Sequence, residues 1–134
     1  MKIKAHHLSA LRLWLLGLTG ATSLGYAGLA LAQNQPNPVY WWVPIAVGLI
    51  TAIVLFLVFL AASSASAKAA TDELYRMLNQ RAAAEAYWIS LVLLILTSVA
   101  IGHGLWAPNT LLAATAAAMG GTYLIRFVWL DLRA

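Results

Sequence analysis

The chain contains no cysteine, which excludes disulfide bonds, thiolate catalysis and metal sites built from thiolates. Charged residues are also scarce, at 9% of the 134 residues, whereas soluble globular domains have about 25%. So few charges cannot cover a water-facing surface, and 63% of the residues are hydrophobic. The composition therefore excludes a soluble globular domain and favours one small membrane domain without a separate soluble module.

Apolar residues form four long runs, which predict an all-α integral membrane protein, a four-helix bundle. The predicted spans cover residues 8–32, 39–62, 86–106 and 110–130. Residues 63–85 between the second and third spans are expected to form an inner loop with an amphipathic helix. Because neither proline nor glycine occurs between Asp72 and Ile101, this helix should run without a break into the third span.

Local signals mark where two of these helices should begin. Thr71 is a candidate N-cap of the long helix, and Asp72 in its first turn can form an i,i+4 ion pair with Arg76. Before the second span, Asn37 is a candidate cap and Pro38 can occupy the first helical position. The sequence therefore predicts helix starts near residues 72 and 38.

The basic residues alternate with uncharged connectors along the chain. Residues 33–38 and 107–109 carry no charge of either sign. The basic residues all lie elsewhere, and they are Lys2, Lys4, Arg12, Lys68, Arg76, Arg81, Arg126 and Arg133. This alternation is the positive-inside pattern. It predicts a multi-pass protein of the cell inner membrane with both termini and the inner loop on the cytoplasmic side, and the dispersed bases do not favour nucleic-acid binding.

The first run admits a second interpretation as a cleaved secretory signal. Ala30-Leu31-Ala32 before Gln33 has the small-x-small form of a signal-peptidase site. The apolar stretch is about 20 residues, however, which is longer than the 7–15 residues of the apolar h-region of a usual signal peptide. We therefore interpret it as a retained first span, whereas cleavage would leave three spans.

Small residues recur at helical spacing in the first and fourth runs. In the first run they are Gly17, Ala21, Gly25 and Gly28. In the fourth run they are Ala113, Ala117 and Gly121, with Ala116 and Gly120 alongside. Membrane helices gain stability where small residues let backbones approach closely. These stripes therefore predict helix packing, either within the chain or against a partner subunit, and the alanine-rich fourth run is expected to pack against protein.

The last two spans are expected to form a hairpin that brings opposite charges together. Counting from their tight turn places Glu85 near the depth of Arg126, and Arg81 near that of Asp131. Because Arg126 lies within an apolar run, an ionic partner would lower the free energy of burying its charge. We expect these two ion pairs, with snorkelling of Arg126 to the headgroups as the alternative.

The centres of the spans carry hydroxyl groups but no Asp, Glu, His or Lys, so the sequence does not predict an enzyme. His6 and His7 at the inner end and His103 at the outer end are separated by the hydrocarbon core of about 30 Å. They cannot jointly hold one haem. His103, which lies between two glycines near Trp106, could alone hold a haem or a chlorophyll-type pigment, or it could form hydrogen bonds at the interface.

The middle quarter of the chain resembles small bacterial four-span integral membrane proteins. The resemblance lies in Asp72-Glu73, followed by Arg81-Ala82 and then Tyr87-Trp88 at the start of a span. It implies a four-span fold and carries no activity or functional residues.

Three functions are compatible with these features. The first is a non-catalytic accessory or scaffolding subunit that binds other membrane proteins or a second copy of itself. The second is a proton-coupled exporter acting as a dimer, since size and span number resemble the small multidrug-resistance transporters. Those transporters use an acidic residue in the first span, which this chain lacks, and Glu85 lies only at the membrane edge. The third is a pigment- or haem-holding polypeptide that uses His103.

Overall fold

The computed structural model describes residues 5–62 and 72–134, and all regular structure within them is helical. These residues form α1 (Ala5–Gln33), α2 (Val43–Ala61), α4 (Glu73–Gly102) and α5 (Pro108–Leu132). Each of these helices is long and apolar enough to cross a membrane. At 1.5 Å per residue, the 19 residues of α2 extend about 28 Å, close to the thickness of a hydrocarbon core, whereas the 30 residues of α4 extend about 45 Å.

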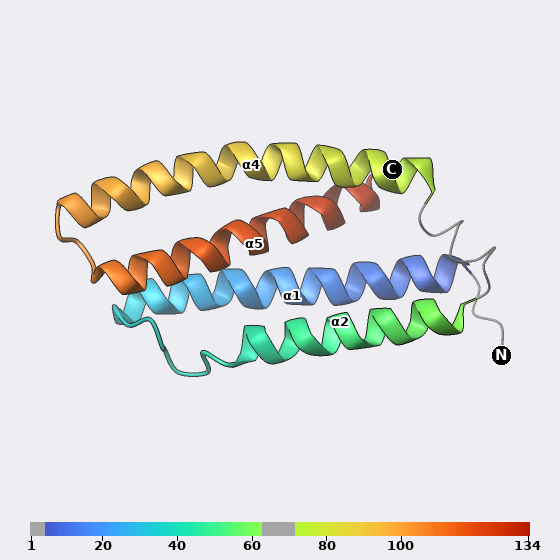
Figure 1. The fold of residues 1–134 in the computed structure, drawn as a ribbon, viewed down its shortest axis with the longest axis horizontal. Helices are drawn as coiled ribbons and strands as arrows, with labels where there is room; N and C mark the ends of the chain where they lie inside the picture. The colour runs from blue at the N-terminus through green and yellow to red at the C-terminus, as the bar shows by residue number, and fades with distance from the viewer. Residues whose placement is uncertain (1–4, 63–71) are drawn as a thin grey trace.

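The helices pack in the order α2–α1–α5–α4 (Figure 1). Helix α5 lies between α1 and α4, and α2 packs mainly on α1. The beginnings of α1 and α4 and the ends of α2 and α5 lie together at one end of the molecule, which we call the terminal end. The connections from α1 to α2 and from α4 to α5 lie at the opposite end, which we call the loop end.

Hydropathy explains the places of α5 and α2 in this order. Helix α5 has a mean hydropathy of 1.4 in its most apolar window, and 22% of that window is buried, the largest share among the described helices. Helix α2 has a mean hydropathy of 2.9, and only 6% of its window is buried. The alanine-rich helix therefore occupies the protein interior, as its weak transfer free energy predicts, and the leucine-rich helix faces outward.

Two pairs of threonine hydroxyls join neighbouring helices, one near mid-span and one nearer the loop end. The hydroxyls of Thr19 and Thr51 lie 2.9 Å apart and connect α1 to α2. The hydroxyls of Thr97 and Thr115 lie 2.5 Å apart and connect α4 to α5. Because lipid offers no hydrogen-bond partners, such bonds between hydroxyls contribute to the association of neighbouring helices.

The loop end is tied together by hydrogen bonds between the two connections. A residue with left-handed backbone follows the end of each of α1 and α4, namely Asn34 (φ 49°) and Gly104 (φ 65°). Backbone amides just beyond the two helices donate hydrogen bonds to their last carbonyls. The side-chain oxygen of Asn34 also accepts a hydrogen bond of 2.9 Å from the amide of Ala107. The indole of Trp106 donates to the carbonyl of Leu31 at 2.9 Å. These bonds hold the two hairpins in one register.

The second span begins later than the sequence predicts, at Val43 in place of Val39. Residues 38–42 form turns, in which Trp41 N bonds to Pro38 O and Val43 N to Tyr40 O. Tyr40 has a φ of 66°, which a right-handed helix does not allow. The helix can therefore start only after it, and Pro44 then lies in the first turn, where the missing amide is tolerated.

The long third helix is present, but its ends differ from those predicted. It ends at Gly102, four residues before Trp106, because the left-handed Gly104 terminates the helical hydrogen bonds. Its N-cap is Asp72, whose carboxylate accepts a hydrogen bond of 2.9 Å from the amide of Tyr75. The predicted cap Thr71 lies outside the described residues, as do Lys2, Lys4 and Lys68 and the first part of the inner loop, residues 63–71.

Candidate functional site

A cavity of about 220 Å³ near the terminal end is lined by side chains from α1, α2, α4 and α5. Its polar lining consists of Arg12 on α1, Tyr75 and Asn79 on α4, and Tyr123 on α5. Five leucine and phenylalanine side chains complete the wall. We call this the terminal cavity. It brings four polar side chains from three helices together.

The terminal cavity lies one to two helical turns inside the terminal end. Arg12 lies seven residues after the start of α1, and Asn79 lies six residues after the start of α4. At 1.5 Å per residue these offsets correspond to about 10 Å. In a membrane, this depth is near the boundary between headgroups and hydrocarbon.

Arg12 is the most deeply buried charged group of the terminal cavity, with 5% of the residue exposed. Its Nη2 atom lies 3.4 Å from Oδ2 of Asp131 on α5. Its guanidinium carbon lies 4.3 Å from the ring centre of Tyr75 and 5.6 Å from that of Phe127. A buried guanidinium loses its hydration, and the carboxylate and the two aromatic rings offset part of that loss.

The two polar groups opposite Arg12 bond to each other. The hydroxyl of Tyr123 donates to the side-chain oxygen of Asn79 at 2.5 Å. This bond joins α5 to α4 and leaves the amide nitrogen of Asn79 as a donor. The polar wall of the terminal cavity is therefore rich in hydrogen-bond donors.

A second charged group lies on the α4–α5 interface, nearer the middle of the molecule. Arg126 Nε donates to Oε2 of Glu85 at 2.7 Å, and its Nη2 contacts the same oxygen. Arg81, one turn earlier on α4, donates to Oε1 of Glu85 at 3.1 Å. The Glu85 carboxylate thus binds two guanidinium groups at once, and the structure brings Glu85 and Arg126 together at the depth that the hairpin register predicts.

The structure does not bring Arg81 to Asp131, because these side chains face different helices. Arg126 and Asp131 are five residues apart on α5, which places them about 140° apart around its axis. Arg126 therefore faces α4, whereas Asp131 faces Arg12 on α1. Arg81 lies four residues before Glu85 and shares its face, so it pairs within α4. Counting along the hairpin gave depth, but it gave no direction around the helix.

The small-residue stripe of α5 faces α1. An added Cβ at Gly121 would lie 2.9 Å from Leu24 and 3.0 Å from the carbonyl of Gly20, so the two backbones are close there. Ala117 packs against a buried cluster formed by Ala27, Ala30 and Ala114. The neighbouring Ala113 is partly buried. The helices meet where Gly20 and Gly121 face each other.

The predicted stripe on α1 lies mostly on another face of that helix. An added Cβ at Gly17 would lie 3.8 Å from Val128, but Gly25 and Gly28 have no atom within 4 Å of such a position. Ala21 is also exposed on the surface of the molecule. The face that contacts α5 instead carries Gly20, three residues after Gly17. Ala21, Gly25 and Gly28 therefore remain uncovered in the described chain, and Gly17 is partly buried.

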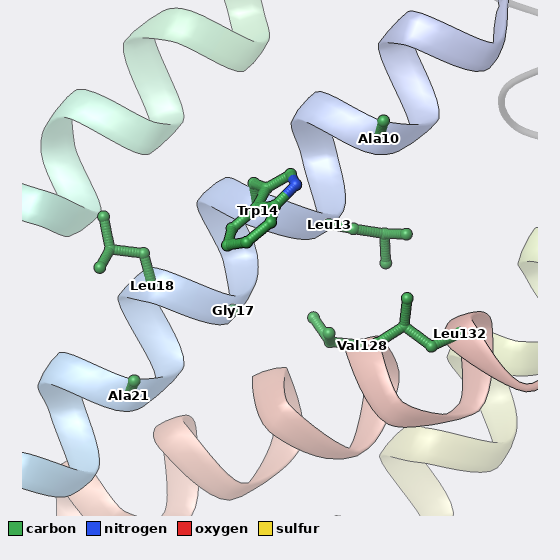
Figure 2. A pocket seen from close by; sticks show the side chains of 8 residues that line it. All are labelled: Ala10, Leu13, Trp14, Gly17, Leu18, Ala21, Val128 and Leu132. Carbon is green, nitrogen blue, oxygen red and sulfur yellow. The ribbon is translucent and has the colours of Figure 1, made fainter.

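An apolar groove of about 520 Å³ lies along this uncovered face of α1, which we call the α1 groove (Figure 2). Its floor includes Gly17 and Ala21, and Val128 and Leu132 of α5 form one side. The indole of Trp14 stands over α1 beside Gly17, and 81% of Trp14 is exposed. The groove contains no charged side chain.

Neither His7 nor His103 lines these two sites. His103 is the C-cap of α4 and is exposed at the loop end. A cavity of about 240 Å³ nearby is lined by Trp106 and by the Thr97 and Thr115 pair, but His103 is not part of its wall. His7 is exposed near the start of α1. Within residues 5–62 and 72–134, no group of three His, Cys, Asp or Glu could hold a metal ion.

Sequence reasoning did not identify Arg12 or Gly20 as site residues. Arg12 has a usable signal, because it lies inside the first apolar run, where a charge needs a partner. Gly20 shares a seven-residue spacing with Leu13 and Ala27, which also lie on the α5 side of α1. That spacing marks a helix-packing face.

Comparison of the chain with models of protein families, with curated proteins and with solved structures finds no match.

Proposed function

We propose that this protein is a non-catalytic accessory or scaffolding subunit of an inner-membrane assembly, with both termini on the cytoplasmic side. The observation that carries the proposal is the uncovered small-residue face of α1 in the α1 groove. In lipid, helices associate where small residues allow close backbone approach. Gly17 and Ala21, four residues apart, present such a surface to a helix outside this chain.

The internal packing of the chain supports this interpretation of the groove. Where α1 meets α5, Gly20 and Gly121 already form a close contact, so the same helix uses small residues for packing on one side. The stripe that contains Gly17 and Ala21 does not pack closely on another helix within the described residues. A transmembrane helix of a partner subunit could pack over Gly17 and Ala21, beside Trp14, and so cover this stripe.

The terminal end also fits a cytoplasmic orientation. Arg76, Arg81 and Arg133 lie at or near this end and are exposed. The connections at the loop end carry no charge. The positive-inside rule then orients the terminal end toward the cytoplasm.

The exporter and pigment alternatives have less support. The Glu85 carboxylate binds Arg126 and Arg81, an arrangement that favours a permanently ionised group over one that exchanges protons. His103 does not line the neighbouring cavity, so a flat macrocycle there would lack its ligand.

Purification from native membranes in mild detergent tests the proposal, with all co-purifying subunits identified. The wild-type chain should co-purify with a defined membrane partner. Ala21→Leu should abolish that association, because a leucine on the groove floor prevents close backbone approach. Ala52→Leu is the matched control, since Ala52 is also exposed but lies on α2.

Because the chain has no cysteine, a single Ala21→Cys substitution gives an unambiguous cross-linking site for the partner. Recovery of the wild-type chain as a monomer alone would contradict the proposal, as would equal loss of the partner from both leucine variants.

A further inference from the structure

We propose that the terminal cavity binds a phosphate oxyanion, of the kind carried by a phospholipid headgroup, through Arg12 and Asn79. This inference concerns a different part of the molecule from the α1 groove and does not depend on the proposed subunit role. It rests on three observations: the chemistry of the cavity wall, its depth, and the arrangement of the helices around it.

The cavity wall offers donors to an acceptor-rich ligand. A guanidinium carries five N–H donors in a fork, so Arg12 can contact Asp131 through Nη2 and a phosphate oxygen on the cavity side at the same time. The Asn79 oxygen already accepts from Tyr123, so its nitrogen donates. Phosphate oxygens, which only accept when ionised, complement this wall.

The cavity lies near the boundary between headgroups and hydrocarbon, within reach of a lipid phosphate. Arg12 lies about 10 Å inside the start of α1, and α2, whose length is close to the hydrocarbon thickness, contributes its last turns to the same wall through Leu55 and Phe59. These two apolar side chains lie beside the polar groups. A headgroup held by Arg12 would place its acyl chains along the aliphatic surface of α2.

The helix packing leaves one side of the cavity available for entry from the bilayer. Helix α2 packs on α1, and α4 packs on α5, but α2 and α4 are not closely packed on each other in the described residues. A phospholipid can therefore approach laterally between α2 and α4. A soluble phosphate would instead enter from the terminal end.

Ligand-dependent thermal stability of the purified full chain in an uncharged detergent tests the proposal. Phosphatidylglycerol, phosphatidylcholine and inorganic phosphate are titrated separately, and apparent dissociation constants follow from the shifts in Tm. A shift with either phospholipid at a lower concentration than with inorganic phosphate supports the lipid source, because both lipids carry the phosphate oxyanion. A shift with inorganic phosphate of similar affinity supports the soluble source. The absence of a shift with all three ligands overturns the proposal.

Variants of the buried pair distinguish binding from general electrostatic attraction. The double substitution Arg12→Gln and Asp131→Asn removes both charges together and should weaken binding roughly tenfold or more. Asp131→Asn alone removes the carboxylate that competes with the ligand and should tighten binding. Arg76→Ala is the control, because it removes one exposed cation at the same end without touching the cavity.

Leu16→Phe keeps the proposal testable if the pair variants do not fold. It fills the cavity without changing any charge, and it should weaken binding while leaving the fold intact. Equal weakening by Arg76→Ala and by the cavity variants would overturn the proposal, because it would assign the effect to the overall positive charge. Unchanged affinity in Leu16→Phe would overturn it as well.

Discussion

At the scale of single residues, the most informative feature is the way paired charges are divided between two separate groups. Arg12 and Asp131 form one group on the α1–α5 side, and Glu85 with two arginines forms the other on the α4–α5 side. Each guanidinium that faces the protein interior has a carboxylate partner. In an apolar environment such pairing decides which face of a helix can turn inward.

The Glu85 group leads to an asymmetric prediction. Glu85→Gln should lower the Tm in detergent more than Arg126→Gln, because loss of the carboxylate leaves Arg126 and Arg81 as neighbouring like charges. Arg126→Gln leaves Glu85 bonded to Arg81. The double variant should resemble Arg126→Gln alone. Thermal unfolding of all three variants checks this, and strictly additive shifts in Tm would show that the two side chains act independently.

At the scale of elements, α5 is the helix on which the fold depends. It packs on both α1 and α4, and its alanine and glycine residues allow close approach on the α1 side. Helix α2 is the opposite case, since Thr51 is its one buried residue among those described. The sequence composition of each helix therefore matches its number of neighbours.

Two adjacent glycines of α5 test the packing of α1 on α5. Gly121→Ala places a Cβ 2.9 Å from Leu24 and 3.0 Å from a backbone carbonyl, so it should lower the free energy of unfolding by roughly 1–3 kcal/mol. Gly120→Ala meets no atom within 4 Å and should be neutral or stabilising by up to about 1 kcal/mol, through helix propensity. Denaturation in detergent measures both, and equal effects would refute the close contact between α1 and α5.

At the scale of the whole molecule, the described helices form two hairpins whose connections meet at the loop end. The side chain of Asn34 and the indole of Trp106 link these connections. This arrangement places every helix terminus that carries charge at the other end. The basic residues at the terminal end alone should therefore determine the orientation of the protein in the membrane.

Single cysteines report this orientation directly, because the native chain has none. Asn37→Cys in the connection at the loop end should react with a membrane-impermeant thiol reagent added outside intact cells. Arg76→Cys at the terminal end should react only after the membrane is opened. The reverse labelling pattern would invert the proposed topology and would place the terminal cavity in the outer leaflet.

Much of the fold was predictable from the chain because membrane insertion depends on composition. Long apolar runs are each forced to satisfy their own backbone hydrogen bonds, so four spans and an uninterrupted α4 followed from hydropathy and from the absence of proline and glycine. The start of α2 was not predictable in this way. It depends on the positive φ of Tyr40, which no propensity indicates.

The candidate sites were only partly accessible from sequence. Depth along a helix follows from counting residues, so Glu85 and Arg126 could be placed at one level. Direction around the helix follows from which neighbour packs on which face, and this requires the tertiary arrangement. For that reason sequence reasoning assigned Asp131 to Arg81, and it placed the α1 contact on Gly17 in place of Gly20.

The amino-acid sequence alone predicted how many helices are long and apolar enough to cross a membrane and how far the charges lie from the helix ends. Transfer free energy and helical rise depend only on local residues. The tertiary structure decided which side of each helix is buried. That choice set Arg12 of the terminal cavity beside Asp131 and left Ala21, Gly25 and Gly28 of α1 uncovered. Rotation about a helix axis is determined by the packing of its neighbours.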